Sequence, residues 1–311
     1  MRFIKNWILA TFILTFLVII AGGVVRTTQS GMGCPDWPHC FGKWIPPTNA
    51  SELPPDFEKY LSKQDIDHSF NALHTWIEYV NRLLGALLGL FALIQTALLF
   101  LKRKTLRKPF FLSLGFLVIV ILTGLFGAIV VKLNLANLSI SVHLLFAVIL
   151  IQIQLALLLA IHARTASLIT DAKTKNLLWV FLAVLIIQSV MGTMVRMHVD
   201  DISKMLDYQQ REKWLSDGPV VFLIHRSFSW IVLIFSLYLA WYGKLFPAVK
   251  KQIFVLASVI LLSMITGIVL SYADMPKAAQ PIHLLLATFA ITQCFSILFQ
   301  IKNNNGVTSG N

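Results

Sequence analysis

The sequence has little charge, few acidic residues and few cysteines. Only 13% of its 311 residues are charged, 57% are hydrophobic, and the mean hydropathy is +0.75. Because soluble domains carry about 25% charged residues, this composition excludes a soluble enzyme. Aspartate and glutamate together number 14 against 26 lysines and arginines, which gives a formal net charge of +12.

Long apolar runs make up most of the chain. Runs of about 20 residues, enough to cross a hydrocarbon core of roughly 30 Å, predict transmembrane helices. We expect eight of them, near residues 7–26, 76–101, 109–131, 141–162, 177–196, 220–243, 252–272 and 281–301. The first run lacks a small-residue cleavage site, so we expect an uncleaved helix. The lack of an arginine- and serine-rich import leader indicates a bacterial plasma membrane.

The positive charge is sorted by loop. The loops after the second, fourth and sixth predicted helices are basic, with Lys102, Arg103, Lys104, Arg107, Lys108, Arg164, Lys173, Lys175, Lys244, Lys250 and Lys251. The acidic residues gather in two long loops, about 27–70 and 197–219. Because lysine and arginine mark the cytoplasmic side, we expect both termini inside the cell and both long loops outside. The charge therefore reflects topology and does not indicate a nucleic-acid partner.

Parts of the first half recur in the second half at a nearly constant spacing. The matched segments are Asn81-Arg82 with His225-Arg226 at a spacing of 144, Leu122-Thr-Gly-Leu with Ile265-Thr-Gly-Ile at 143, and His143-Leu-Leu with His283-Leu-Leu at 140. Such spacing indicates an internal duplication. The predicted fold is an all-α membrane protein of two pseudo-symmetric four-helix bundles, residues 1–165 and 166–311.

Three histidines and one asparagine occupy equivalent helix ends in this repeat. We expect His143, His225, His283 and Asn81 at one depth near the outer surface, and histidine inside a membrane helix is functional by default. Two imidazoles from facing helices can take both axial positions of a haem iron. We therefore predict that His225 and His283 hold a six-coordinate, electron-carrying haem. His143 faces Asn81, a weak iron ligand, which predicts a second haem that is the substrate.

Four arginines follow the ligand positions or end helices in matching settings, namely Arg26, Arg82, Arg196 and Arg226. Guanidinium groups suit carboxylates such as haem propionates, and interfacial arginines also snorkel as membrane anchors. The sequence leaves both roles open.

One face of the second predicted helix carries three polar residues. His74, Glu78 and Asn81 are spaced by four and three residues and share that face. Glu78 has two candidate roles, pairing with Arg82 or His74, and acid–base or substrate-positioning chemistry at the reacting carbon. His74 lies about 10 Å from Asn81 along the helix axis. It is a candidate displaced iron ligand, proton relay or partner of a ligand.

The three cysteines divide between an outer loop and a helix. Cys34 and Cys40 lie in GCPDWPHC, where an oxidising compartment permits a disulfide. Cys294 is expected to be an apolar filler of the last helix. Three interpretations of the loop pair stay open: a structural staple, a dithiol that exchanges with a partner, and a zinc site completed by His39.

Together these residues resemble the haem A synthase family of cytochrome oxidase assembly. The resemblance covers nearly the whole chain and is carried by GGVVRTTQSGMGCPDWPHC, by the Glu-x-x-x-Arg of IEYVNR and by the three histidine segments. It implies an oxidoreductase that converts the C8 methyl of haem O to a formyl group by successive hydroxylations and dehydration, with oxygen derived from water. It also implies roles for individual residues: a haem b on His225 and His283, a substrate-haem half with His143, an important carboxylate at Glu78 and an outer-loop pair at Cys34 and Cys40.

The chain departs from the family pattern at Asn81, where Glu-x-x-His-Arg is usual and this chain has Glu-Tyr-Val-Asn-Arg. That departure leaves His74 as the candidate replacement ligand. The predicted function is haem A synthase, with haem O as substrate, haem b as cofactor, and haem O synthase and oxidase assembly factors as candidate partners. One rival is a haem-binding electron carrier or haem-delivery protein, which Asn81 favours. The other is a dihaem quinone oxidoreductase. The sequence does not identify the electron acceptor.

Overall fold

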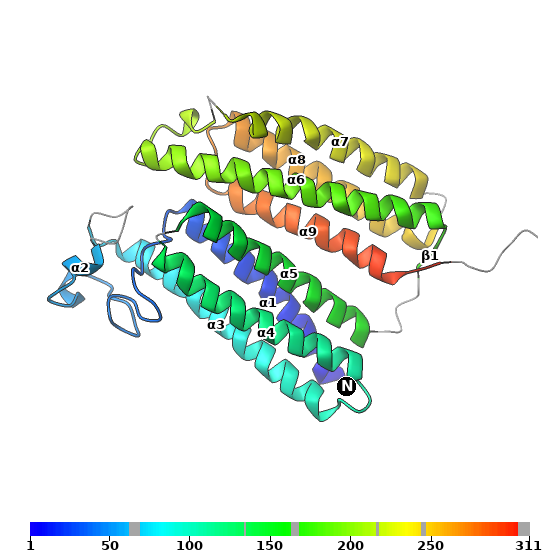
Figure 1. The fold of residues 1–311 in the computed structure, drawn as a ribbon, viewed down its shortest axis with the longest axis horizontal. Helices are drawn as coiled ribbons and strands as arrows, with labels where there is room; N and C mark the ends of the chain where they lie inside the picture. Colours follow the sequence, from blue (N-terminus) through cyan, green and yellow to red (C-terminus); the bar gives the residue numbers. More distant parts are fainter. Residues whose placement is uncertain (62–68, 134, 163–167, 216–217, 244–246, 304–311) are drawn as a thin grey trace, which may run out of the picture. The chain divides into compact units, whose positions relative to one another are not determined.

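Eight long helices dominate the structure, a computed structural model that describes all residues except 62–68, 134, 163–167, 216–217, 244–246 and 304–311. Within the described residues, eight helices are long and apolar enough to cross a membrane. They are α1 (Arg2–Thr27), α3 (Ala72–Leu101), α4 (Arg107–Lys132), α5 (Asn137–Ile161), α6 (Ala172–Met205), α7 (Val220–Gly243), α8 (Pro247–Tyr272) and α9 (Ala279–Gln300). The predicted all-α membrane fold is confirmed (Figure 1). Short turns η1 (Ala50–Glu52), α2 (Glu58–Leu61) and η2 (Arg211–Lys213) lie in the connections.

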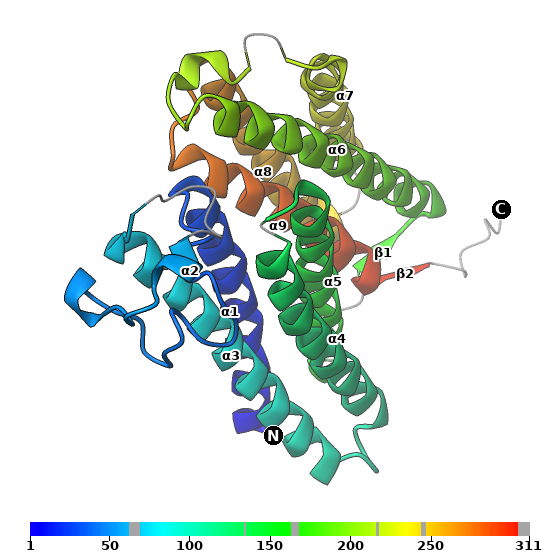
Figure 2. The same ribbon diagram turned by 60° about the vertical axis from the view of Figure 1, so that its left-hand side comes forward.

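The chain divides into two compact units. Unit 1 comprises Met1–Ile161 with Lys204–Tyr208, and unit 2 comprises His162–Ser203 with Gln209–Asn311. In unit 1, α1 and α4 each pack against both α3 and α5, so the four helices close into a ring (Figures 1 and 2). Helices α3 and α5 are therefore diagonal to one another. The ring encloses apolar side chains that include Leu14, Leu88, Ala92, Phe116 and Val120.

Unit 2 has one continuous apolar core. Helix α8 packs against α7 and α9, which places α7 and α9 on either side of it. The core joins all four helices of the unit through side chains that are at most 1% exposed, among them Phe181, Leu239, Leu256 and Ile297. Many large apolar side chains on the opposite faces of these helices are exposed, including Trp230, Ile234 and Trp241. In a membrane these exposed faces meet lipid.

Two features differ from the sequence-based expectation. The predicted outer loop was expected to start at residue 197, but α6 continues to Met205. Neither glycine nor proline interrupts residues 197–205, and the i,i+4 pair of Arg196 and Asp200 supports the extra turns, with 2.9 Å between Nη2 and Oδ2. A parallel pair of three-residue strands, β1 (Leu168–Thr170) and β2 (Ile301–Asn303), was also not predicted. Strands this short carry no usable periodicity.

Candidate functional site

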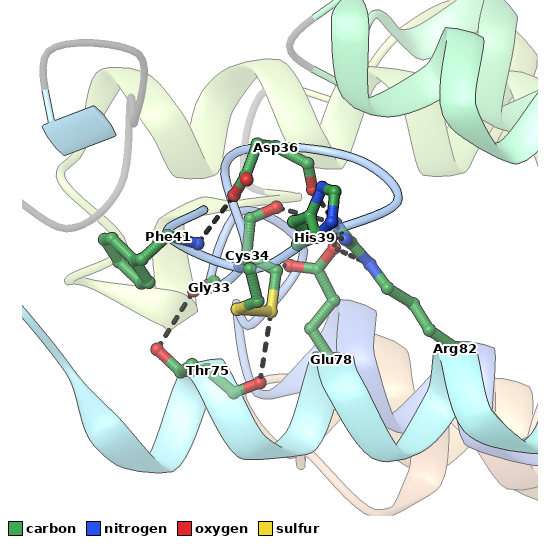
Figure 3. A network of polar contacts seen from close by, with 9 residues as sticks. Gly33, Cys34, Asp36, His39, Phe41, Thr75, Glu78 and Arg82 are labelled. Carbon is green, nitrogen blue, oxygen red and sulfur yellow. Dashed lines mark hydrogen bonds and ion pairs between the residues drawn. A yellow bond between two sulfur atoms is a disulfide. The ribbon is translucent and has the colours of Figure 1, made fainter. Parts of the chain in front are cut away.

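The long loop between α1 and α3, which the charge pattern predicts to be the outer loop, packs on the first turns of α3 (Figure 3). Asn71 caps this helix, because its Oδ1 accepts the His74 backbone N–H at 3.2 Å. Gly33 packs directly on the same turn, since a Cβ at this position would lie 2.4 Å from the His74 carbonyl oxygen. Thr75 Oγ1 donates to the Gly33 carbonyl at 2.9 Å. Only glycine fits the chain this closely to the helix backbone.

A disulfide joins Cys34 and Cys40, with their Cα atoms 4.7 Å apart. The predicted pairing is confirmed, and the zinc interpretation is wrong because both thiols are consumed. Both cysteines are buried, and they pack against Phe41. Asp36 closes the loop, because its carboxylate accepts the backbone N–H groups of Phe41 at 2.7 Å and Gly42 at 2.9 Å. The cross-linked loop is therefore a compact element with its own hydrogen bonds.

Glu78 and Arg82 clamp this loop to α3 (Figure 3). Glu78 is 4% exposed, and its Oε2 accepts the Cys34 N–H at 2.8 Å. Its Oε1 accepts Arg82 Nε at 3.1 Å and Nη2 at 2.5 Å. The remaining guanidinium hydrogens go to loop carbonyls: Arg82 Nη1 donates to Asp36 at 2.6 Å and His39 at 3.0 Å, and Nη2 donates to Cys34 at 2.6 Å. All five N–H groups of Arg82 therefore have protein acceptors, and the pairing of Glu78 with Arg82 is observed.

Asn81 Oδ1 and His143 Nδ1 are among the buried polar atoms of unit 1 that have no hydrogen-bond partner within the described residues. They come from α3 and α5, the diagonal helices of the ring. His143 lies in the second turn of α5, with its Cε1 3.5 Å from the position of a Cβ on Gly127. His74 lies two turns before Asn81 on α3 and is half-buried. Unpartnered buried groups of this kind are costly unless a ligand satisfies them.

Unit 2 holds the matched histidine pair. His225 lies on α7 and His283 on α9. Each ring stands over a glycine of another helix: the Cε1 of His225 is 3.2 Å, and that of His283 3.4 Å, from the Cβ position of Gly192 and Gly267 respectively. A Cβ at Gly192 would require a slight shift of the His225 ring, and a Cβ at Gly267 would come into van der Waals contact with the His283 ring. Among the described residues, His225 Nδ1 is buried without a partner.

His283 is the best-supported of the three histidines. Its Nδ1 is 3.0 Å from the Ser263 carbonyl oxygen and 2.9 Å from Thr266 Oγ1. Because a carbonyl only accepts, Nδ1 carries the hydrogen and Nε2 keeps its lone pair. In the predicted repeat Thr123 corresponds to Thr266, and both hydroxyls donate to a carbonyl of their own helix, at 2.6 and 2.8 Å. Among the described residues, Thr266 Oγ1 also contacts a histidine, whereas His143 Nδ1 has no partner. The two halves therefore support their equivalent histidines differently.

The other predicted arginines have separate surroundings. Arg196 pairs with Asp200 in α6. Arg226 is exposed, with Nη1 3.5 Å from Tyr272 Oη. Arg26 is half-buried in the last turn of α1. A role in binding propionates remains a prediction for all three.

Sequence reasoning missed the residues that support the rings. The Thr-Gly pair at 266–267 was recognised as part of the repeat, but its contact with His283 depends on the register of α8 against α9. The same holds for Ser263, and the contact of Gly192 with His225 depends on the register of α6 against α7. The sequence did mark Gly192, because it is the first residue of a G-x-x-V-R segment that occurs in both halves of the chain.

A family model described as cytochrome oxidase assembly protein matches residues 5–295. The chain is similar to the haem A synthase of Shewanella oneidensis, 32% identical over 174 residues that cover 55% of this chain and 50% of that protein. It is similar to the haem A synthase of Nitrosospira multiformis, 32% identical over 142 residues that cover 43% and 39%. The chain thus spans about half the length of these relatives. The haem A synthase of Flavobacterium johnsoniae is 22% identical over 322 residues, covering 92% of this chain and 94% of that protein.

Proposed function

This chain belongs to the family of cytochrome oxidase assembly proteins, and from that membership we propose that it is a haem A synthase of a bacterial plasma membrane. The proposed reaction oxidises the C8 methyl of haem O to a formyl group, with oxygen taken from water. Relatives named haem A synthase support this proposal, and so does the chemistry of the two histidine sites. Haem O is the substrate, and a haem b is the proposed resident cofactor.

The histidine pair of unit 2 carries the proposal. The hydrogen bond from His283 Nδ1 to Ser263 fixes the ring and leaves Nε2 free, as is typical of imidazoles that bind metals. The His225 and His283 rings each lie over a glycine of another helix. These residues fit a haem, and we propose His225 and His283 as its axial ligands. A haem bound there supplies one-electron transfer.

Unit 1 is the proposed substrate site. His143 offers one imidazole, and Asn81 on the diagonal helix offers an amide, with one buried atom of each unpartnered among the described residues. An amide is a weak iron ligand, which suits a haem that binds, reacts and leaves. Glu78 is the proposed acid–base carboxylate. Its position depends on Arg82 and on the Cys34 N–H, so we assign Arg82 to positioning the carboxylate and the loop.

The topology and the partners complete the proposal. We place both termini in the cytoplasm and the two long loops outside, following the distribution of lysine and arginine. The supply of haem O requires a prenyl-transferring haem O synthase, and the product goes to oxidase assembly. A haem held by His225 and His283 would supply one-electron transfer to an external acceptor.

The decisive experiment supplies the chain with haem O in membranes and measures haem A by chromatography and mass. We expect haem A in the purified protein, and a well-folded, haem-loaded protein that yields none would refute the enzymatic function. His225→Ala and His283→Ala should each abolish the low-spin haem b spectrum. The matched control is His198→Ala in the same unit, which should retain that spectrum.

A second candidate function is haem-binding electron transfer or haem delivery without catalysis. Asn81 favours it, because this position lacks the strong ligand found at the equivalent His225. A protein that binds haem and undergoes redox cycling without producing haem A would establish this alternative. Asn81→His should then shift the unit 1 haem toward six-coordinate, low-spin spectra, whereas an unchanged spectrum would show that another group, such as His74, already occupies that position.

A further inference from the structure

A second polar cluster lies in unit 1, near the opposite ends of the helices from His143. Gln95 on α3 and Gln154 on α5 form a two-way amide pair across the diagonal of the ring, with N···O distances of 3.1 and 2.8 Å. Gln154 Nε2 also donates to the Ile8 carbonyl of α1 at 3.0 Å. Gln95 Nε2 donates to Ser113 Oγ of α4 at 3.2 Å. One hydrogen-bond network therefore joins all four helices.

This cluster, which we call the inner lock, consists of Gln95, Thr96, Ser113 and Gln154. Their exposed fractions are 1%, 8%, 0% and 0%. Thr96 Oγ1 and Ser113 Oγ are 2.8 Å apart, and each amide hydrogen of the two glutamines has an acceptor. With no donor left over, the cluster is not a ligand site. Its bonds hold helices together, because separated helices would leave these groups unpaired in hydrocarbon.

The equivalent positions of unit 2 are apolar. The spacings of the repeat relate Gln95 to Leu239 (144), Ser113 to Leu256 (143) and Gln154 to Cys294 (140). All three of these unit 2 side chains are buried in one apolar core. Cys294 Sγ donates to the Leu178 carbonyl of α6 at 3.6 Å, just as Gln154 Nε2 donates to the Ile8 carbonyl of α1. The two acceptors are also equivalent, because Ile8 and Leu178 are 170 residues apart, the same spacing that relates Arg26 to Arg196. The locations therefore correspond, and only the chemistry differs.

At the other end of unit 1, several buried polar atoms lack hydrogen-bond partners among the described residues. Among the described residues, Asn81 Oδ1, His143 Nδ1 and Trp76 Nε1 are buried there without a hydrogen-bond partner. Gly22 and Gly124 are exposed, and no atom lies within 4 Å of a Cβ built on either, whereas a Cβ on Gly127 would lie 3.5 Å from the His143 ring. Their counterparts Gly192 and Gly267 are covered by histidine rings. Unit 1 thus has one end with a fully hydrogen-bonded polar cluster and another end, with His143, where buried polar groups lack partners among the described residues.

We infer that the inner lock holds the inner ends of α1, α3, α4 and α5 in one register, so that helix separation in unit 1 is confined to the end with His143. The existence of the inner lock is inferred from its hydrogen bonds alone. Its use rests on the proposed function: a substrate half must admit and release a haem, whereas a cofactor half retains one. A polar lock at one end lets the other end open without loss of the bundle.

Reporter cysteines test this inference in the full-length protein without any haem. Among the described residues Cys294 is the only free cysteine, and it is buried, so the thiol background is low. Ala156→Cys on α5 places a reporter beside the lock, and Val130→Cys on α4 places one near the far end. The two native side chains are 7% and 8% exposed, so the sites are matched. The measurement is the maleimide labelling rate of each reporter, with and without Gln154→Leu.

We expect Gln154→Leu to raise labelling at the Ala156→Cys reporter by about threefold to fifteenfold, the range that membrane interhelical hydrogen bonds imply. Labelling at the Val130→Cys reporter should change less than twofold. Gln293→Leu in α9 is the control, because Gln293 donates one bond to the Gln252 carbonyl at 3.3 Å in unit 2. It should change neither reporter.

The inference is overturned if Gln154→Leu leaves the Ala156→Cys reporter unchanged, or if both reporters accelerate equally. If Gln154→Leu does not yield folded protein, Ser113→Ala removes a single hydroxyl and should still accelerate the Ala156→Cys reporter selectively. An unchanged rate in Ser113→Ala would likewise overturn it. Since no haem is present, a failure here is distinct from a failure of the proposed enzymatic activity.

Discussion

Replacing Arg82 by lysine tests how the outer loop is held on α3. Arg82 donates to Glu78 and to the carbonyls of Cys34, Asp36 and His39 through all five of its N–H groups. Lysine keeps the positive charge but has only three donors on one atom. Hydrogen bonds to charged groups contribute about 1.5–3 kcal/mol each. Allowing for partial replacement by lysine and water, we expect a loss of about 3 kcal/mol in loop anchoring, which is roughly a hundredfold increase in the open fraction.

Reduction of the buried disulfide measures that open fraction. Cys34 and Cys40 are 0% and 1% exposed, so a membrane-impermeant phosphine reaches the bond only when the loop lifts. Arg82→Lys should accelerate reduction, followed by alkylation and mass measurement, by about a hundredfold. Arg226→Lys is the matched control. This arginine is equivalent in the repeat, but it is exposed and contacts only Tyr272 Oη at 3.5 Å among the hydrogen bonds described.

Equal reduction rates in Arg82→Lys and the unsubstituted protein would refute the clamp. So would equal acceleration by Arg82→Lys and Arg226→Lys, because the effect would then be general destabilisation. A rate increase confined to Arg82→Lys supports the clamp, and any accompanying loss of haem A formation would connect loop position to catalysis.

Two further predictions concern a glycine and a threonine, each with a control position in the same chain. Gly33→Ala should strongly increase proteolysis of the outer loop, because the new Cβ would lie 2.4 Å from a backbone oxygen of α3, whereas Gly22→Ala, in open space, should leave proteolysis unchanged. Thr266→Val should weaken haem binding to unit 2 by about tenfold to a hundredfold in a haem titration, as loss of support for a metal-binding histidine does. Thr123→Val, which removes no contact to a histidine, should not weaken it, and equal effects of the two threonine variants would contradict the assigned support of His283.

The eight membrane helices could be predicted from the chain because length and hydropathy are local properties. The end of α6 could not, since Met197–Met205 is polar enough to resemble a loop yet stays helical with support from the Arg196–Asp200 pair. The β1–β2 pairing joins residues more than 130 positions apart, and no local pattern reports it. The repeat spacings predict which histidines are equivalent, because a duplication leaves residue types in register.

The chain alone revealed which residues are equivalent: Asn81 with His225, His143 with His283, and a cysteine pair able to form a disulfide. Residue type and spacing suffice for that, because they do not depend on packing. Tertiary structure decided what each group contacts. In the folded chain Arg82 donates hydrogen bonds to the loop carbonyls, and His283 Nδ1 donates to the Ser263 carbonyl. His143 Nδ1, by contrast, has no hydrogen-bond partner among the described residues. Hydrogen bonds between helices depend on rotation and register to within about an ångström, and those quantities are set by the packing of whole helices.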